Sequence, residues 1–286
     1  MSEGHAGHIE VLHLGIRFGE GETAVNAVDD VTMEVQPGTF VSIVGPSGCG
    51  KSTLLNVVAG FIKPTVGSVR VSGQPVQGPG ADRGMVFQQY SLFPWRTVRK
   101  NVEFGLQMQG MEANRRERAA RTLLGLAGLL SFENHYPHQL SGGMKQRVGI
   151  VRALATSPKV LLMDEPFGAL DSQTRVVMQQ ILTNMWQKLR ISVLFITHDI
   201  DESIFLSDKI YVMTARPGTI KAVLDVNLPR PREPSMCNTT AYLALRQQLH
   251  DLIREESFKA MGGELTPEAL LGMSINVGEK GVGELI

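Results

Sequence analysis

A glycine-rich segment that follows a short apolar run constrains the fold more than any other feature of the sequence. The run spans Thr39–Val44, and the residues Lys51–Phe61 have the pattern of a helix. The segment between them fits G-x-x-x-x-G-K-[ST] and consists of Gly45, Pro46, Ser47, Gly48, Cys49, Gly50, Lys51 and Ser52, with Thr53 next. A strand, a glycine-rich loop and a helix in this order predict a phosphate-binding loop at the start of an α/β unit.

Each residue type in this loop has a physical role in binding phosphate. Glycines let the backbone curl so that successive N–H groups point at phosphate oxygens, and the N-terminus of the following helix adds a positive end. We expect Lys51 to reach the β- and γ-phosphates of a nucleotide and the Ser52 hydroxyl to hold Mg²⁺. Cys49 has no Cys or His partner nearby in the sequence, so we expect its backbone N–H to matter rather than its thiol.

A second motif places two carboxylates at the end of another buried strand. The apolar run Val160–Met163 is followed directly by Asp164 and Glu165. In P-loop enzymes such an aspartate holds Mg²⁺, which is the role we expect for Asp164. Glu165 would then lie beside the γ-phosphate and orient or deprotonate the attacking water. The alternative is that the two acids only cap the next helix.

A third motif is a second candidate anion site. Leu140–Arg147 is a loop with the residues Ser141, Gly142 and Gly143 at the opening of a helix, and helix N-termini attract anions. The alternative is a serine N-cap followed by flexible glycines.

The order of elements predicts an α/β core that is interrupted by helices. Strands are expected at Ile9–Phe18, Val28–Val35, Thr39–Val44, Val66–Val71, Met85–Phe87, Val160–Met163, Val193–Ile196 and Lys209–Met213. Helices are expected at Lys51–Phe61, Thr97–Leu106, Asn114–Leu130, Met144–Thr156, Ser172–Leu189, Asp201–Leu206 and Thr240–Glu256. We therefore expect a nucleotide-binding domain over 1–228 with a helical insert at about 89–158. A proline-rich linker and a short helical tail occupy 229–286, where the Gly-rich end Met273–Ile286 is expected to be loose.

Composition excludes several classes of protein. The 286 residues include 28 Lys and Arg against 28 Asp and Glu, so the net charge is zero and gives no reason to expect nucleic acid as a partner. The basic run Arg115–Arg118 is interpreted as a solvated helix face. Only two cysteines are present, which excludes a disulfide scaffold. No apolar stretch reaches the roughly 18 residues of a membrane span, and the start lacks the pattern of a secretory signal. We expect a cytoplasmic protein whose membrane role, if any, comes through a partner.

Together these motifs resemble those of the ATPase subunit of ABC transporters, over about Ile9 to Leu228. The resemblance rests on the phosphate-binding loop, on Leu140–Gln146 as the family signature and on the acidic pair after Val160–Met163, in the family's order. Further matching positions are Gln88 for the Q-loop glutamine, Gly168–Asp171 for the D-loop, His198 for the switch histidine and Phe18 for the ring that stacks on adenine. Gln89 is a rival for the Q-loop position, and Phe18 has the alternative of being a core residue.

The resemblance implies a fold, a reaction and an assembly. The fold would be a P-loop NTPase core, with a RecA-like mixed sheet, an N-terminal antiparallel β subdomain and a helical insert subdomain. Two copies would form a head-to-tail dimer with two ATP molecules and Mg²⁺ at the interface. The signature residues Ser141, Gly142 and Gly143 would close over the γ-phosphate on the other copy, and Asp171 would also border the nucleotide. Gln88 would touch Mg²⁺ or the attacking water, and His198 the γ-phosphate.

The resemblance also implies membrane partners. The aromatic residues in Gln88–Trp95 suit a groove for a helix of an integral membrane permease, although Phe93 and Trp95 have the alternative of being insert core. A nucleotide domain on a chain of its own is the organisation of importers, in which a separate solute-binding protein also takes part. The segment Phe87–Trp95 and the short tail are similar to the nitrate, sulfonate and taurine importer group. The chain would then lie on the inner face of the cell membrane.

Two other functions compete with this interpretation. A soluble ABC ATPase of DNA repair or translation usually carries a second nucleotide domain or long inserts. A P-loop kinase or GTPase lacks the Leu140–Gln146 motif.

Overall fold

The apolar run before the phosphate-binding loop forms the central strand of a six-stranded sheet. The computed structural model describes residues 6–260. In it β3 (Phe40–Val44) is buried at every position and pairs in parallel with β8 (Ser192–Ile196) and β9 (Lys209–Met213). The sheet order is β10-β9-β3-β8-β7-β6, completed by β6 (Arg83–Val86), β7 (Val160–Asp164) and the antiparallel edge strand β10 (Ile220–Asp225). Strands that are covered on both faces need continuous apolar sequence, which explains these runs.

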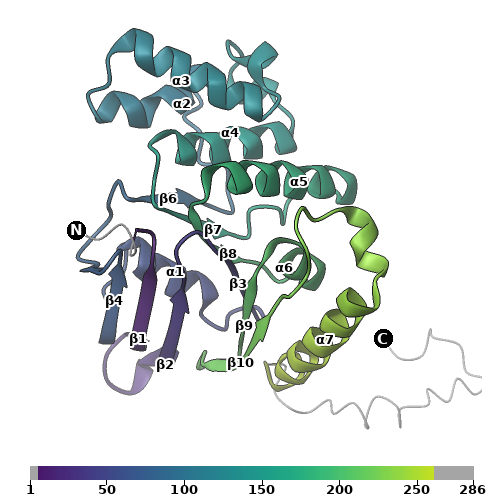
Figure 1. Cartoon of the computed structure of the whole chain (residues 1–286). Coiled ribbons are helices and arrows are strands. Elements are labelled where there is room, and N and C mark those ends of the chain that lie inside the picture. Colours follow the sequence, from purple (N-terminus) through teal and green to yellow (C-terminus); the bar gives the residue numbers. More distant parts are fainter. Residues whose placement is uncertain (1–5, 261–286) are drawn as a thin grey trace, which may run out of the picture.

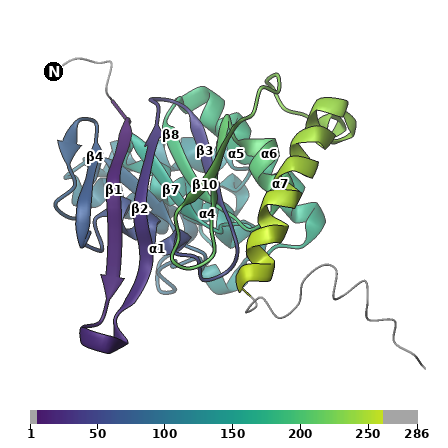
Figure 2. The same cartoon turned by 90° about the horizontal axis from the view of Figure 1, so that it is seen from below.

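A second, antiparallel sheet lies next to this one. Its order is β2-β1-β4-β5, formed by β1 (Ile9–Phe18), β2 (Val25–Val35), β4 (Val66–Val71) and β5 (Gln74–Pro75). The helix α1 (Lys51–Ala59) contributes Leu54, Leu55 and Val58 to a core that it shares with both sheets. This is the predicted P-loop core with its antiparallel β subdomain (Figure 2).

Alternate residues of the parallel strands face two different cores. In β7, Val160 and Leu162 face the core that contains α1, whereas Leu161 and Met163 face the core that contains the insert helices. This follows from the two-residue period of a strand. The sheet is therefore the shared wall between the nucleotide-binding half of the molecule and its helical half.

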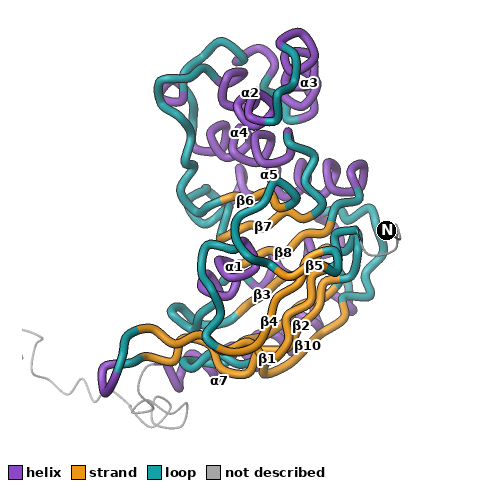
Figure 3. The backbone as a smooth tube through the Cα atoms, turned by 90° about the vertical axis from the view of Figure 1, so that its left-hand side faces the viewer, coloured by secondary structure: helices purple, strands orange, loops and turns teal. Residues whose placement is uncertain are grey.

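The helical insert occupies the segment between β6 and β7. It contains α2 (Val98–Met108), α3 (Ala113–Leu126), the short turns η3 (Leu130–Phe132) and η4 (Pro137–Gln139), and α4 (Gly142–Ala155). These helices form a layer above the strands, next to α5 (Ser172–Leu189) (Figures 1 and 3). The helix predicted to reach Leu130 ends at Leu126 instead, because the chain turns at Ala127 and at Gly128, whose φ is +66°.

The C-terminal helix packs on the core sheet. After α6 (Ile200–Leu206), the turn η5 (Pro234–Asn238) leads into α7 (Thr240–Ala260), which extends four residues beyond the predicted end. Tyr242 and Leu249 of α7 are buried in a cluster with Ile204 and Ile210. The predicted linker is also attached, since Arg230 donates to the Asp208 carboxylate at 2.6 Å. The predicted tail beyond Ala260 lies outside the described residues.

Two strands were not anticipated from the sequence. β10 is an edge strand with one exposed face, and β5 has only two residues, so neither has a strong apolar pattern.

No helix within residues 6–260 combines the length and hydropathy needed to cross a bilayer.

Candidate functional site

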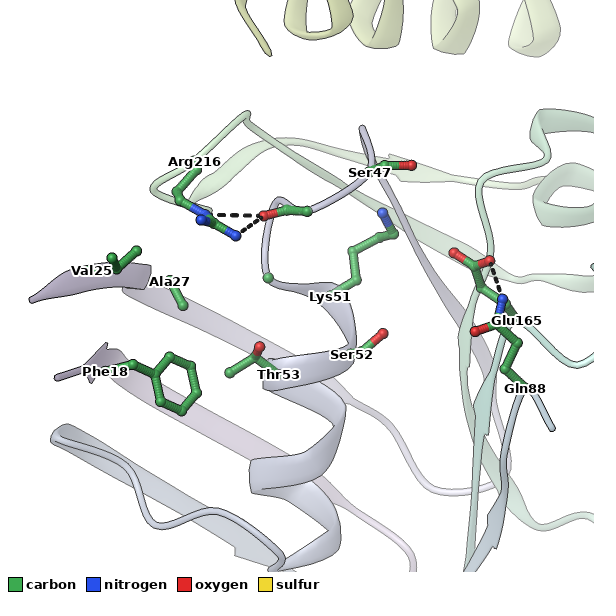
Figure 4. A pocket seen from close by; sticks show the side chains of 12 residues that line it. Phe18, Val25, Ala27, Ser47, Lys51, Ser52, Thr53, Gln88, Glu165 and Arg216 are labelled. Carbon is green, nitrogen blue, oxygen red and sulfur yellow. Dashed lines mark hydrogen bonds between the residues drawn. The ribbon is translucent and has the colours of Figure 1, made fainter. Parts of the chain in front are cut away.

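The phosphate-binding loop borders a pocket of about 530 Å³ at the carboxyl end of β3 (Figure 4). A volume of this size is typical of small-molecule sites. The pocket is lined by Phe18, Val25, Ala27, Ser47, Gly48, Gly50, Lys51, Ser52, Thr53, Gln88, Glu165 and Arg216. Most of the residues that the sequence assigned to one nucleotide site therefore meet in one place.

The loop adopts backbone conformations that require its glycines. Gly48 and Gly50 have φ values of +75° and +102°, in the left-handed region that side chains disfavour. A Cβ atom at Gly50 would also lie 2.7 Å from the Ala27 carbonyl oxygen, so β2 approaches the loop too closely for any side chain. Gly50 is the N-cap of α1, and the curled loop thus ends at the positive end of that helix.

Lys51 is held inside the loop that it follows. Its side chain is 5% exposed, and Nζ donates to the carbonyl oxygens of Gly45 and Pro46 at 2.9 and 2.8 Å. The ammonium group is thus fixed beside the amides that an incoming phosphate would meet. Gly45 and Pro46 serve it through their carbonyls and do not line the pocket themselves.

Cys49 is a buried residue of the loop. Burial raises the pKa of its thiol, and this outweighs the opposing effect of Lys51, whose Nζ lies 3.8 Å from the sulfur. A raised pKa disfavours the reactive thiolate. The side chain also does not line the pocket, which agrees with the expectation that the backbone of Cys49 matters instead.

Ser52 and Asp164 join the phosphate-binding loop to the end of β7. The Ser52 hydroxyl donates to Asp164 Oδ1 at 2.9 Å. Burial raises the pKa of Asp164, and the nearby Glu165 charge adds to the rise, whereas the Ser52 hydrogen bond and Lys51 oppose it. Burial makes the charged form of Asp164 unfavourable. A divalent cation bound beside this carboxylate would stabilise the charged form.

These oxygen donors fit Mg²⁺. Among residues 6–260 no cluster of three or more His, Cys, Asp or Glu side chains could hold a metal ion. Mg²⁺, however, is usually bound by one or two protein groups together with phosphate oxygens and water. Ser52 and Asp164 supply this kind of partial set.

Glu165 brings two other predicted catalytic residues together. Its Oε2 accepts from Gln88 Nε2 at 3.5 Å and lies 3.2 Å from His198 Nδ1. The backbone of Glu165 has a φ of +42°, a strained value for a residue with a side chain, and its N–H is bonded to the Ile196 carbonyl. This tight turn after β7 directs the carboxylate to the edge of the pocket. Gln89 does not line the pocket, so the geometry favours Gln88 over its rival.

The signature residues lie elsewhere. Ser141 caps α4 by accepting from the Met144 N–H at 3.3 Å, and Asp171 caps α5 by accepting from the Thr174 N–H at 3.0 Å. A Cβ atom at Gly143 would meet the Thr174 side chain, so the two helix starts are neighbours. Neither Ser141, Gly142, Gly143 nor Asp171 lines the pocket. Within one chain the two loops that the sequence predicts to bind anions remain separate.

The aromatic residues divide into two groups. Phe18 lines the pocket with 45% of its surface exposed, which suits a platform for a base better than a core position. In the insert, Phe93 packs edge-on against Phe104 with ring centroids 4.7 Å apart. Trp95 is 72% exposed. Phe93 is thus half-buried against another ring of the insert, whereas Trp95 does not fit the core alternative.

Three pocket residues were missed by sequence reasoning. Val25 and Ala27 come from β2, and Arg216 comes from the loop that follows β9. A signal for Arg216 was present, because β9 is the parallel neighbour of β3. Loops after parallel strands gather at the same edge of a sheet, and the loop after Lys209–Met213 should therefore reach the phosphate-binding loop.

Comparison with known proteins agrees with this geometry. The family model for ABC transporters matches residues 28–168. An uncharacterized ABC transporter ATP-binding protein of Methanocaldococcus jannaschii is 48% identical over 88% of this chain and 94% of its own. A nitrate import ATP-binding protein of Synechocystis is 53% identical over 79% of this chain and 85% of its own. A taurine import ATP-binding protein of Yersinia pestis is 49% identical over 70% of this chain and 79% of its own.

Solved structures show the same fold. The ATP-binding cassette MJ0796, in a dimeric post-hydrolysis state bound to ADP and Pi, is 33% identical with a TM-score of 0.68. The match covers 77% of this chain and 100% of the MJ0796 chain. Clostridium perfringens cbiO1, part of the ABC transporter complex cbiONQ, has a TM-score of 0.70 at 27% identity. The match covers 76% of this chain and 88% of the cbiO1 chain. None of these relatives carries a name from DNA repair or translation. The chain therefore belongs to the ABC transporter family and is an ATP-binding ATPase subunit of that family.

Proposed function

We propose that this chain powers an importer, by coupling ATP binding and hydrolysis in a dimer to the uptake of a solute such as nitrate, a sulfonate or taurine. The observation that carries the proposal is the separation of the two anion-binding loops. The pocket holds Lys51 and Glu165, whereas Ser141 lies at the start of α4, outside it. The nitrate and taurine import proteins among its relatives support the importer and the class of solute.

A second copy of the chain completes the site in this proposal. Ser141 and Gly142 of one copy would face the γ-phosphate that is bound at Lys51 of the other. Each copy then supplies one loop to each of two identical sites, as a closed two-fold dimer requires. ATP joins the copies because its charge is shared between two sets of donors, and the dimeric neighbour bound to ADP and Pi supports this arrangement.

Within the pocket, Phe18 would stack on adenine while the loop amides and Lys51 hold the phosphates. Thr53 and Ser47 also line the pocket and would donate to phosphate oxygens. Ser52, Asp164 and Gln88 would hold Mg²⁺, which supplies positive charge to the β- and γ-phosphate oxygens. Catalysis of this kind depends mostly on positioning and electrostatics.

Glu165 would act as the base in hydrolysis. A water held by the Glu165 carboxylate and Gln88 gives its proton to Glu165 as its oxygen bonds to the γ-phosphorus. The bond to the β-phosphate oxygen then breaks, and ADP and phosphate are released. His198, which lies 3.2 Å from the same carboxylate oxygen, would contact the γ-phosphate and keep Glu165 in line.

The permease would bind beside the exposed Trp95. Phe93 and Phe104 form a rigid base for this region, and Arg96 lies over both rings, at 5.8 and 4.9 Å from their centroids. The Trp95 ring lies against this base, with its centroid 5.7 Å from that of Phe93, and an exposed aromatic side chain in such a place is typical of an interface anchor. The chain would thus lie at the inner face of the membrane, and a solute-binding protein would act on the far side, without touching it.

Glu165→Gln is expected to keep ATP binding and to lose turnover. Gln has the same shape but cannot take a proton, and losing a general base costs roughly 10²- to 10⁴-fold in rate. The measurements are the Kd of a fluorescent ATP analogue and the rate of phosphate release. Asp164→Asn is the matched comparison, because it removes the neighbouring charge and should weaken Mg²⁺-dependent binding itself. Turnover by Glu165→Gln at the wild-type rate would contradict the assignment.

Trp95→Ala is expected to weaken membrane association about 30-fold, because a central aromatic anchor contributes at least about 2 kcal/mol to binding. Its ATPase activity in solution should stay at the wild-type level. The measurement is co-sedimentation with membranes that contain the permease subunits. Val223→Ala removes an exposed apolar side chain from β10 and serves as the control. Equal association of both variants with the membranes would count against this docking site.

A further inference from the structure

The loop between β9 and β10, residues 214–219, lies against the phosphate-binding loop. Arg216 donates from Nε and Nη2 to the Gly48 carbonyl oxygen, at 3.3 and 3.1 Å. Figure 4 shows these two bonds, with Arg216 and Lys51 on opposite sides of the loop. The guanidinium therefore contacts the backbone of the phosphate-binding loop at the wall of the pocket, on the side of the loop opposite Lys51.

This contact fixes the orientation of one amide. The carbonyl of Gly48 and the N–H of Cys49 belong to the same planar peptide, in which they point in opposite directions. By holding the carbonyl toward Arg216, the guanidinium turns the Cys49 N–H toward the side where Lys51 lies. Gly48 has a φ of +75° and no side chain, so its own conformational preference does little to fix this peptide.

The same loop makes a second contact with the phosphate-binding loop at Gly218. A Cβ atom at this position would collide with the Cys49 carbonyl oxygen. Gly218 is also bonded to β2 on both sides, since its N–H donates to the Ala27 carbonyl at 3.1 Å and its carbonyl accepts from Asp29 at 3.0 Å. The loop is packed between β2 and the phosphate-binding loop, so a shift of one is transmitted to the other.

The C-terminal helix holds this loop at its other end. Glu256 of α7 is 2% exposed, and its Oε2 accepts from the Ala215 N–H at 2.9 Å. Its Oε1 is bonded to the ammonium groups of Lys221 and Lys259, at 2.8 and 2.9 Å. Burial raises the pKa of Glu256, but these three hydrogen bonds outweigh it and lower the pKa to about 2. The carboxylate is thus ionised over the whole working range of pH.

We propose that Arg216 is a positioning residue for the phosphate-binding loop, and that α7 sets the affinity for ATP by holding Arg216 through Glu256 and Ala215. The proposal rests on the proposed binding of ATP at this loop. It gives the C-terminal helix a function beyond packing. Any partner that pulls on α7 would change the orientation of the Gly48–Cys49 peptide and thereby the affinity for nucleotide.

The test compares Arg216→Ala and Glu256→Ala with wild type, as full-length chains. Each should raise the Kd of a fluorescent ATP analogue and the KM for ATP about 5- to 20-fold, the size expected when a charge-assisted hydrogen bond is lost. The kcat should stay within about twofold, because Glu165 and Lys51 are untouched. Arg216→Lys should recover part of the affinity, since one donor is restored. The double variant should be no weaker than Arg216→Ala alone, because both changes act through one connection.

Glu255→Ala is the matched control. Glu255 is ion-paired with the same two lysines as Glu256, at 2.5 and 3.0 Å, but it is exposed and has no bond to Ala215. Its Kd should remain within about twofold of the wild-type value. An equal loss in both glutamate variants would refute the role of Glu256.

Arg216 is exposed, so Arg216→Ala tests the proposal even if Glu256→Ala does not fold. A wild-type Kd for Arg216→Ala would overturn the proposal. A loss of kcat together with a lower melting temperature would also overturn it, because the residue would then have a general structural role. If the wild-type chain itself failed to bind the ATP analogue, the result would contradict the proposed function and not the proposed link from Glu256 through Arg216 to the phosphate-binding loop.

Discussion

The arrangement of the molecule depends on the backbone amides of the phosphate-binding loop at the end of β3. These amides bind an anion only while the loop is curled, and the curl requires Gly48 and Gly50 at positive φ. Such a loop has few apolar contacts of its own, so it needs support from neighbouring elements. β2 supports the loop on one side, and the Lys51 ammonium supports it by donating to a carbonyl oxygen of the loop. By our proposal, Arg216 supports it as well.

By our proposal, the same constraint explains why one chain would not complete the site. In that proposal the signature serine would bind the γ-phosphate from a helix N-terminus, and Ser141 is placed at the start of α4 by the insert rather than by the sheet. The sheet separates two cores, with α1 on one side and α4 on the other. The loops at the starts of these helices therefore lie apart within the chain, and in our proposal a second copy brings them together.

Sequence reasoning was most successful where local geometry determines the chemistry. The parallel strands and the residues of the Gly45–Ser52 loop were predictable from apolar runs and glycine spacing. The meeting of Gln88, Glu165 and His198 was anticipated only through the family resemblance. The role of Arg216 and the docking of α7 were missed, because both depend on tertiary contacts between residues far apart in the sequence. The edge strand β10 was missed because an exposed edge needs no apolar pattern.

Complementation between two defective chains tests most directly whether the site is shared between two copies. Lys51→Ala disables the phosphate-binding loop, and Ser141→Asp places a negative charge opposite the γ-phosphate while it keeps a good N-cap for α4. Each variant alone should have almost no ATPase activity. A one-to-one mixture should recover up to about a quarter of the wild-type rate, because half of the dimers then contain one intact site out of two. A mixture no more active than its components, or full activity of Ser141→Asp alone, would contradict a site shared between two copies.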